Sequence, residues 1–258
     1  MLQIVIPMAG LGSRFADAGY STPKPLIPVH GIPMIEVVIN NLRPQRPHRF
    51  HFICQRKHQH EFGLAEKLQQ IEPTGQVHLI DGLTAGAACT VLATRAVIDS
   101  KDPLMIANCD QWIHASIDDY LNAWDASGCE GFIMTMDADS PKWSYVRRDA
   151  NGAVTEVVEK KVVSREATVG IYNFAPGAAF VRAADQMIAA NARVNNEFYV
   201  APCYTWMIRA GMQCEAWSIG TDRNGMYGLG IPADLDRFVN LGFESKLQAE
   251  RAAGRKAA

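Results

Sequence analysis

The sequence predicts an α/β fold with a mostly parallel, mixed sheet and helices on both of its faces. Short β-branched runs alternate with helical patterns through the first 110 residues, in the order β-α-β-α-β-α-β. A glycine-rich turn follows the first of these runs directly, which is typical of the carboxyl end of a strand in such a sheet. With 258 residues the chain is long enough to bury the core of one large domain.

The first half contains four expected strands, at 4–7, 50–54, 76–80 and 103–107. Helices are expected between them at 33–42, 58–71 and 85–98, the first with Pro33 at its first helical position. Parallel strands end at one edge of their sheet, and ligands bind beyond that edge. We therefore expect the glycine turn after the first strand and Asp110 after the fourth to lie together.

The second half is less regular. Runs at 143–148 and 153–158 are joined by Asp149-Ala150-Asn151-Gly152, a hairpin signal, and a further strand is expected at 167–174. Helices are expected at 177–191, 198–209 and 233–250. We interpret residues 1–250 as a single domain with halves 1–115 and 116–250, and we expect residues 251–258 to form a frayed tail.

Composition excludes several classes of partner. The formal net charge is −2, which gives no broad basic face, so we expect no nucleic acid partner. None of the six cysteines has C-x-x-C spacing, which favours a reducing, cytoplasmic setting. No stretch is long and apolar enough to span a bilayer, so we expect no membrane partner.

The motif with the clearest chemistry is Gly10-Leu11-Gly12-Ser13-Arg14, followed by Pro23-Lys24-Pro25. Two glycines after a strand let backbone N–H groups approach a polyphosphate. Arg14 can pair with phosphate oxygens through two hydrogen bonds, and Lys24 supplies a compact charge. The alternative is a glycine turn with two solvated cations. The pattern is neither a Walker loop nor a dinucleotide fingerprint.

Residues 4–42, with this motif and the following Gly31-Ile32-Pro33-Met34-Ile35, resemble the N-terminal signature of the sugar-phosphate nucleotidyltransferases. The resemblance implies a Rossmann-like domain of the GT-A type and a Mg²⁺-dependent reaction. In that reaction a nucleoside monophosphate passes from an NTP to a sugar 1-phosphate or similar small phosphomonoester, and pyrophosphate is released. Such an activity would serve nucleotide-sugar or surface polysaccharide biosynthesis, with Arg14 and Lys24 stabilising the transition state.

Asp110 is the candidate metal ligand. A carboxylate at the end of a buried strand projects into the ligand crevice and suits Mg²⁺, although capping of the next turn is the alternative. Asp110 matches the metal-binding aspartate of the family. The family often has a second acidic ligand near the C-terminus, where this chain has Gly228 instead. Asp222 is the nearby candidate for that role.

Further site residues are expected from the same resemblance. An E-K pair at Glu159 and Lys160, with Gly170 on the next strand and Glu197 beyond it, corresponds to the acceptor-binding groups; a charged hairpin edge and a helix cap are the alternatives. Residues 84–88 stand where the family reads the base. The expected nucleotide-binding residues are Ala9, Gly10, Gly12, Ser13, Gly86, Ala88 and Asn108.

Two other functions remain open from the sequence. A glycosyltransferase would usually hold its metal through D-x-D, whereas Gln111 and Trp112 follow Asp110. A non-catalytic nucleotide-binding subunit is favoured by Gly228 and opposed by Arg14 and Lys24. The acceptor could also be a phosphorylated amino alcohol, polyol or amide. Neither the base nor the acceptor follows from the sequence, and a homo-oligomer is possible.

Overall fold

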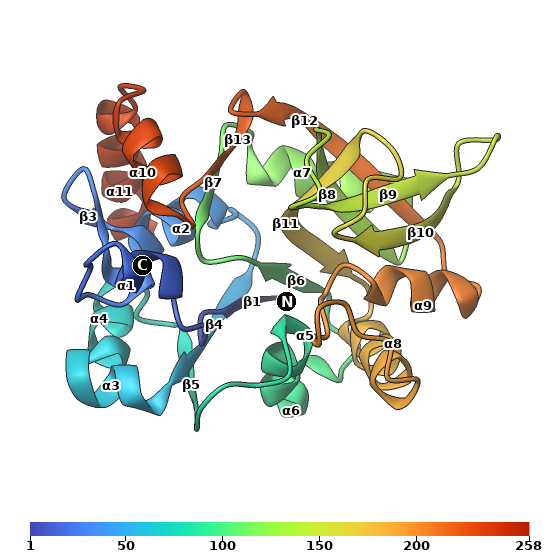
Figure 1. Ribbon diagram of the computed structural model, residues 1–258, viewed down its shortest axis with the longest axis horizontal. Helices are drawn as coiled ribbons and strands as arrows, with labels where there is room; N and C mark the ends of the chain where they lie inside the picture. Colours follow the sequence, from blue (N-terminus) through green and yellow to red (C-terminus); the bar gives the residue numbers. More distant parts are fainter. Residues whose placement is uncertain (258) are drawn as a thin grey trace.

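The computed structural model describes residues 1–257, with side chains to residue 254. Its centre is an eleven-stranded mixed sheet in the order β5-β4-β1-β6-β11-β8-β12-β13-β7, joined at the side by β9 and β10 (Figure 1). Pairing is parallel among the first-half strands β5, β4, β1 and β6, and antiparallel from β6 to β11 and from β11 to β8. The predicted α/β class with a largely parallel sheet is therefore confirmed.

The strands have the following bounds: β1 (Leu2–Pro7), β2 (Pro28–Val29), β3 (Ile32–Pro33), β4 (His48–Gln55), β5 (Gln76–Ile80), β6 (Leu104–Ala107), β7 (Gln111–Ile113), β8 (Gly131–Asp137), β9 (Ser144–Arg148), β10 (Val154–Glu159), β11 (Glu166–Phe174), β12 (Cys214–Asp222) and β13 (Gly225–Gly228).

The helices, including the short 3₁₀ turns η1 and η2, have these bounds: α1 (Ser13–Asp17), η1 (Lys24–Leu26), α2 (Met34–Leu42), α3 (Arg56–Phe62), α4 (Leu64–Ile71), α5 (Ala87–Val91), η2 (Leu92–Thr94), α6 (Arg95–Ile98), α7 (Ile117–Ser127), α8 (Gly177–Ala189), α9 (Cys203–Arg209), α10 (Pro232–Val239) and α11 (Glu244–Ala257). Among the described residues, no helix is both long and apolar enough to cross a membrane.

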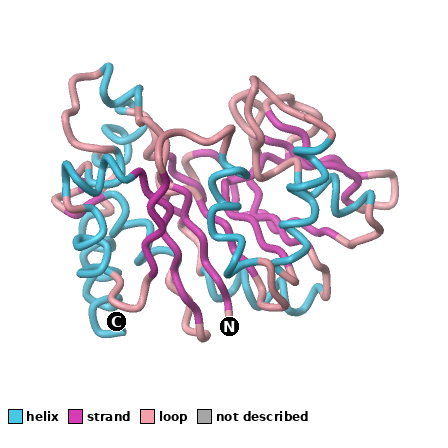
Figure 2. Tube along the Cα trace, turned by 90° about the horizontal axis from the view of Figure 1, so that it is seen from below, coloured by secondary structure: helices cyan, strands magenta, loops and turns pink. Residues whose placement is uncertain are grey.

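Helices cover both faces of the sheet, as the view in Figure 2 also shows. On β1, Ile4 and Ile6 point into a core cluster shared with α2, α4 and α7. Val5 between them points into a second cluster shared with α5, α6, α8 and α9. Because alternate residues of β1 are buried on opposite faces, its residues 4–6 form a continuous apolar run.

Several helices are shorter than the sequence indicates, and glycines explain two of the breaks. The helix expected at 58–71 is divided at Gly63, which has a φ of +58° and ends α3. The helix expected at 233–250 is interrupted around Gly242, with a φ of +74°. Left-handed glycine is a common helix terminator. The helix expected at 198–209 starts only at Cys203, and the segment expected at 85–98 forms α5, η2 and α6.

The C-terminal segment also differs from expectation. α11 continues through Arg251 to Ala257, where we expected a frayed tail. Arg251 Nε donates a hydrogen bond to Glu36 Oε1 at 2.6 Å, and Gly254 is buried against Asn40. These contacts attach α11 to α2, a packing partner more than 200 residues away in the sequence.

His51, on β4, forms a buried polar cluster with side chains of the neighbouring strands β1 and β5. Its Nε2 lies 2.8 Å from Oε1 of Gln3 and its Nδ1 lies 3.1 Å from Nε2 of His78, while the side chain has no exposed surface. Burial, together with the neighbouring His78 and Arg49, lowers the pKa of His51 to about 4. The native state therefore holds His51 neutral over a range in which an unfolded histidine is protonated.

The free energy of unfolding is accordingly expected to fall as the pH drops from about 6.5 to 4, by up to roughly 3 kcal/mol from His51. Stability falls with falling pH because the unfolded chain binds a proton at His51 in this range and the native protein does not. When the free energy of unfolding is measured by denaturant titration at several pH values in this range, it should depend less steeply on pH in His51→Asn than in the parent protein. The exposed His60→Asn variant is the control and should keep the parent slope; equal slopes in all three proteins would contradict this assignment.

Candidate active site

The glycine loop connects β1 to the short helix α1. Gly12 has a φ of +62°, and a Cβ built there would lie 3.3 Å from Cβ of Lys24, so the loop and the Lys24 segment approach each other closely. Among the described residues, none accepts a hydrogen bond from the backbone N–H groups of residues 9–13. A run of free donors on a loop at a strand end is suited to binding phosphate oxygens.

Asp110 stands after β6, next to the glycine loop. Since β1 pairs with β4 on one side and β6 on the other, the two connections leave the sheet at its topological switch point. Lys24 Nζ donates a hydrogen bond to Asp110 Oδ2 at 2.7 Å, and the two side chains are 22% and 24% exposed. The prediction that the glycine turn and Asp110 lie close together is confirmed.

The charge of Lys24 is stabilised at this position. Burial alone would lower the pKa of Lys24, but the charge of Asp110 and its hydrogen bond outweigh burial and raise that pKa above its usual value. The neighbouring Cys109 is buried, and burial raises the pKa of its thiol to about 11. At neutral pH the site thus contains a fixed ammonium group beside a carboxylate, and its cysteine stays a neutral thiol.

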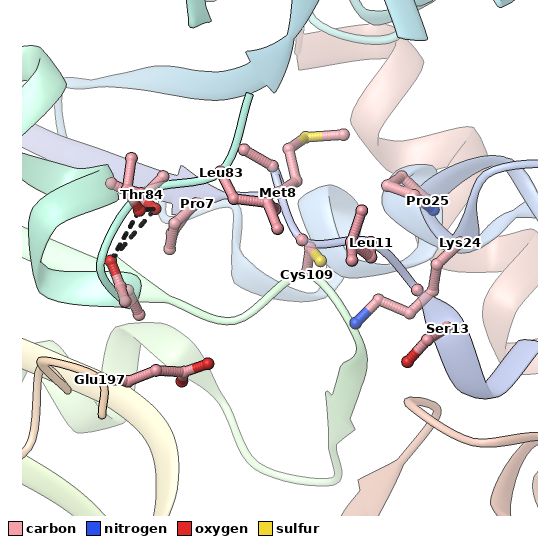
Figure 3. A pocket seen from close by; sticks show the side chains of 16 residues that line it. Pro7, Met8, Leu11, Ser13, Lys24, Pro25, Leu83, Thr84, Cys109 and Glu197 are labelled. Atoms are coloured by element: carbon pink, nitrogen blue, oxygen red, sulfur yellow. Dashed lines mark hydrogen bonds between the residues drawn. The ribbon is translucent and has the colours of Figure 1, made fainter. Parts of the chain in front are cut away.

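Three adjoining hollows run along this edge of the sheet. The glycine-loop hollow has a volume of about 400 Å³ and lies between residues 7–13, residues 83–90, Lys24 and Glu197. Figure 3 shows Lys24 and Ser13 at one end of it, with Thr84 and Glu197 at the other. Thr84 Oγ1 donates to the carbonyl oxygen of Gly86 at 2.9 Å, which holds the far wall together.

The central hollow, of about 180 Å³, is lined by Gly12, Ser13, Arg14, Lys24, Asp110 and Gly230. The hairpin hollow, of about 400 Å³, lies beyond it and is lined by Arg14, Asn108, Asp110, Gln111, Lys142, Trp143, Lys160, Met226, Gly228, Gly230, Ile231 and Asp234. The central hollow shares residues with both neighbours. Two substrates placed in the outer hollows would therefore meet beside Lys24 and Asp110.

Lys160 enters the hairpin hollow from a strained turn after β10. Its φ is +52°, a region that a residue with a side chain rarely adopts, and its N–H donates to the carbonyl oxygen of Trp143. Lys160 Nζ donates to the hydroxyl of Tyr199 at 2.6 Å and lies 4.7 Å from the ring centroid. Such strain in a hollow is characteristic of functional positions.

The structure places most of the expected nucleotide-binding residues together. Ala9, Gly10, Gly12, Ser13 and Gly86 all line the glycine-loop hollow. Ala88 is fully buried behind it, and Ala87 takes its place in the lining. Asn108 lies in the hairpin hollow instead, because its N–H donates to the carbonyl oxygen of Gly170 and its amide turns toward that strand.

The expected acceptor-binding residues are divided between locations. Lys160 lines the hairpin hollow, whereas Glu197 lines the glycine-loop hollow. Backbone hydrogen bonds join Phe198 to Ala85 and Ala88, which draws the Glu197 segment to that side. Glu159 is buried and accepts a hydrogen bond from the hydroxyl of Ser144; burial raises its pKa.

Gly170 supports the hairpin hollow from behind. It has a φ of +82°, and a Cβ built there would lie 2.2 Å from Nδ2 of Asn108 and 2.7 Å from Oε1 of Gln111. Both amide side chains line the hollow. Glycine at this position therefore leaves the space that these amides occupy, and any larger residue would displace them.

The two candidate metal ligands do not converge. Asp222 is paired with Lys142, with 3.5 Å between Oδ2 and Nζ, and it does not line the hollows that contain Asp110. Within the described part of the chain, no group of three or more histidine, cysteine or acidic side chains could hold a metal ion. A cation here would need phosphate oxygens and water among its ligands, which is how Mg²⁺ usually binds with nucleotides.

Sequence reasoning missed several residues of the hairpin hollow: Gln111, Lys142, Trp143 and Asp234. Lys142 Nζ lies 4.4 Å from the ring centroid of Trp143, so these neighbours form one wall. The hairpin signal at 149–152 predicted the strand that follows Lys142 and Trp143, but no local pattern indicates which end of that strand faces Asp110. That depends on how the β9–β10 hairpin folds over the sheet.

Comparison with known proteins identifies the family. A model of the nucleotidyl transferase family matches residues 4–200. The chain belongs to this family.

Curated relatives match parts of the chain. The bifunctional protein GlmU of Coxiella burnetii is 28% identical over 179 residues, which is 66% of this chain but only 37% of GlmU. This chain therefore spans little more than a third of that relative. A 2-aminoethylphosphonate cytidylyltransferase of Lancefieldella rimae is 60% identical over 38 residues, 15% of each chain.

Solved structures match nearly the whole chain. A nucleoside-diphosphate-sugar pyrophosphorylase of Vibrio cholerae has a TM-score of 0.80 at 24% identity, covering 92% of this chain and 99% of that one. A UTP-bound UGPase from Acinetobacter baumannii has a TM-score of 0.71 at 18% identity, covering 95% and 94%. These matches confirm the Rossmann-like fold.

Proposed function

We propose that this protein transfers a nucleoside monophosphate from an NTP to a sugar 1-phosphate, or to a similar small phosphomonoester, with release of pyrophosphate. The observation that carries the proposal is the row of three hollows with Lys24 and Asp110 at its centre. The product would serve nucleotide-sugar or surface polysaccharide biosynthesis.

The NTP is proposed to occupy the glycine-loop hollow, with its phosphates on the free N–H groups of residues 9–13. Arg14 and Lys24 then face the phosphates in the central hollow. The acceptor occupies the hairpin hollow, where Lys160 and Lys142 offset its phosphate charge.

In the proposed reaction, an acceptor phosphate oxygen forms a bond to the α-phosphorus, and the bond from that phosphorus to the bridging oxygen of pyrophosphate breaks. A phosphate monoester is already anionic near neutral pH, so no general base is needed. Lys24 and Arg14 stabilise the charge that builds up on the α-phosphate and the leaving pyrophosphate. Positioning the two substrates in line supplies the remainder of the catalysis.

Mg²⁺ is proposed as the cofactor, and the residues present fit a cation that arrives with its nucleotide. Asp110 has a second carboxylate oxygen, Oδ1, besides the Oδ2 that accepts from Lys24. Gly230 has no side chain, which leaves the space beside Oδ2 open. When bound, the ion would neutralise phosphate charge and polarise the α-phosphate.

An aminoalkyl acceptor is the second candidate, favoured by the 60% identity over 38 residues to the 2-aminoethylphosphonate cytidylyltransferase. The two acceptor classes differ in the group carried beside the phosphate or phosphonate. A test of the proposed function must therefore include both.

The deciding experiment measures pyrophosphate release with each of the four NTPs and Mg²⁺, against several sugar 1-phosphates, phosphoethanolamine and 2-aminoethylphosphonate. Release that requires both the NTP and an acceptor is expected. Activity with a nucleotide sugar as donor and no pyrophosphate would indicate a glycosyltransferase. Nucleotide binding without turnover on any acceptor would indicate a regulatory subunit.

A further inference from the structure

The two lysines of the hairpin hollow differ in what holds them. Lys142 is paired with the carboxylate of Asp222, whereas no carboxylate of a described residue forms an ion pair with Lys160. Lys160 is exposed, and a free lysine side chain samples many rotamers. The hydroxyl of Tyr199, 2.6 Å from Nζ, gives it a fixed partner. A neutral hydroxyl orients the ammonium group without cancelling its charge, so that charge stays free to bind an anion.

Tyr199 is itself held in place from the glycine-loop hollow. The N–H of the preceding residue, Phe198, donates to the carbonyl oxygen of Ala85 at 2.8 Å, and its carbonyl oxygen accepts from the N–H of Ala88 at 3.0 Å. The two segments approach so closely that a Cβ built at Gly86 would lie 2.5 Å from the backbone N of Phe198. The backbone that carries Tyr199 is therefore fixed, and a tyrosine side chain has only two χ angles left to order.

A chain of hydrogen bonds joins the two outer hollows through Tyr199. Lys160 lines the hairpin hollow and Glu197 lines the glycine-loop hollow. The hydroxyl of Tyr199 accepts from Lys160 and also hydrogen-bonds the carboxylate of Glu197. Burial and this carboxylate raise the pKa of Tyr199, so the hydroxyl keeps the proton that it donates to Glu197. A hydroxyl engaged on both sides has a defined direction, and so has the lysine that it holds.

We propose that Tyr199 is a positioning residue for the acceptor: its hydroxyl holds the ammonium group of Lys160 where the phosphate or phosphonate of the acceptor binds. The inference rests on the proposed function, which gives Lys160 to the acceptor. Tyr199 acts through Lys160 and does not touch the reacting atoms. Because Lys160 would contact the acceptor both before and during transfer, loss of the hydroxyl should raise the KM of the acceptor and leave kcat nearly unchanged.

The test is a double-mutant cycle read by the steady-state rate of pyrophosphate release. It uses whichever acceptor has the highest kcat/KM among the sugar 1-phosphates, phosphoethanolamine and 2-aminoethylphosphonate. Tyr199→Phe keeps the ring and removes only the hydroxyl. It is expected to raise the acceptor KM about tenfold, at the low end for a hydrogen bond to a charged group, and to leave the KM of the NTP near the parent value. In a Lys160→Met background it should cause no further rise, because the ammonium group that it positions is gone.

Two comparisons separate positioning from a structural role. Lys142→Met leaves Lys160 in place, so Tyr199→Phe should still raise the acceptor KM about tenfold in that background. Tyr120 on α7 is fully buried, and its hydroxyl donates to the carbonyl oxygen of Phe132 at 3.0 Å. Tyr120→Phe should lower the thermal unfolding temperature and keep the acceptor KM of the parent, whereas Tyr199→Phe should do the reverse.

Equal rises from Tyr199→Phe in the parent and in the Lys160→Met background would overturn the inference, since the hydroxyl would then act independently of Lys160. An unchanged acceptor KM in Tyr199→Phe would overturn it as well. Failure of the proposed function looks different. In that case the parent protein would release no pyrophosphate with any pair of NTP and acceptor, and the inference would fall with it.

Discussion

Replacement of Lys24 by alanine is expected to lower kcat for pyrophosphate release by about 100- to 1,000-fold, the usual cost of removing one preorganised charge from a transition state. Lys24 is the ammonium group between the glycine-loop and central hollows, and its pKa is raised by Asp110, so it stays charged throughout the working range. The loss corresponds to roughly 3–4 kcal/mol of transition-state stabilisation.

The fold should survive this substitution. Both Lys24 and Asp110 are about one-quarter exposed, so water can solvate the carboxylate that is left. Thermal unfolding should therefore shift by only a few degrees. Lys24→Met, which keeps most of the apolar stem, should lose as much activity as alanine, whereas the exposed Lys57→Ala should lose none. Near-normal turnover in Lys24→Ala would refute the proposed catalytic role of Lys24.

Replacement of Gly86 by alanine is expected to lower the free energy of unfolding by about 2–4 kcal/mol, through backbone strain and overpacking together. Gly86 has a φ of +122°, and a Cβ there would lie 2.5 Å from both the N and the O of Phe198. Backbone atoms cannot turn aside as the end of a side chain can. The substitution should push the Glu197 segment away from the glycine-loop hollow and weaken NTP binding.

Gly82→Ala is the matched control, because Gly82 has a φ of +75° and no atom within 4 Å of its built Cβ. Gly82→Ala should lower the free energy of unfolding by only about 1–2 kcal/mol, the cost of holding alanine in a left-handed backbone conformation, and should leave NTP affinity unchanged. Denaturant unfolding and calorimetric NTP titration measure the two effects. If both variants lose equal stability and bind NTP equally well, the contact between Gly86 and Phe198 is not what shapes the hollow.

Much of the fold could be predicted because its strands and turns have strong local signals. The apolar run of β1, the hairpin turn at 149–152 and the alternation through residue 110 each indicate one element type. Helix ends were harder to predict. Gly63 and Gly242 end or interrupt helices only because their backbone adopts positive φ, which the pattern of apolar residues does not reveal.

The sequence by itself determined that the glycine turn and Asp110 lie together. Gly12, Arg14 and Asp110 follow the ends of the parallel strands β1 and β6, which the sheet brings to one edge. Lys24 is held beside them by its hydrogen bond to Asp110.

Only the tertiary structure decided where Glu197 and Asp234 lie. Hydrogen bonds from the Phe198 segment carry Glu197 to the glycine-loop hollow, and the first turn of α10 places Asp234 in the lining of the hairpin hollow. These placements depend on contacts between segments about 110 residues apart in the sequence. Such contacts form only when the whole core packs, so no local pattern of residues can specify them.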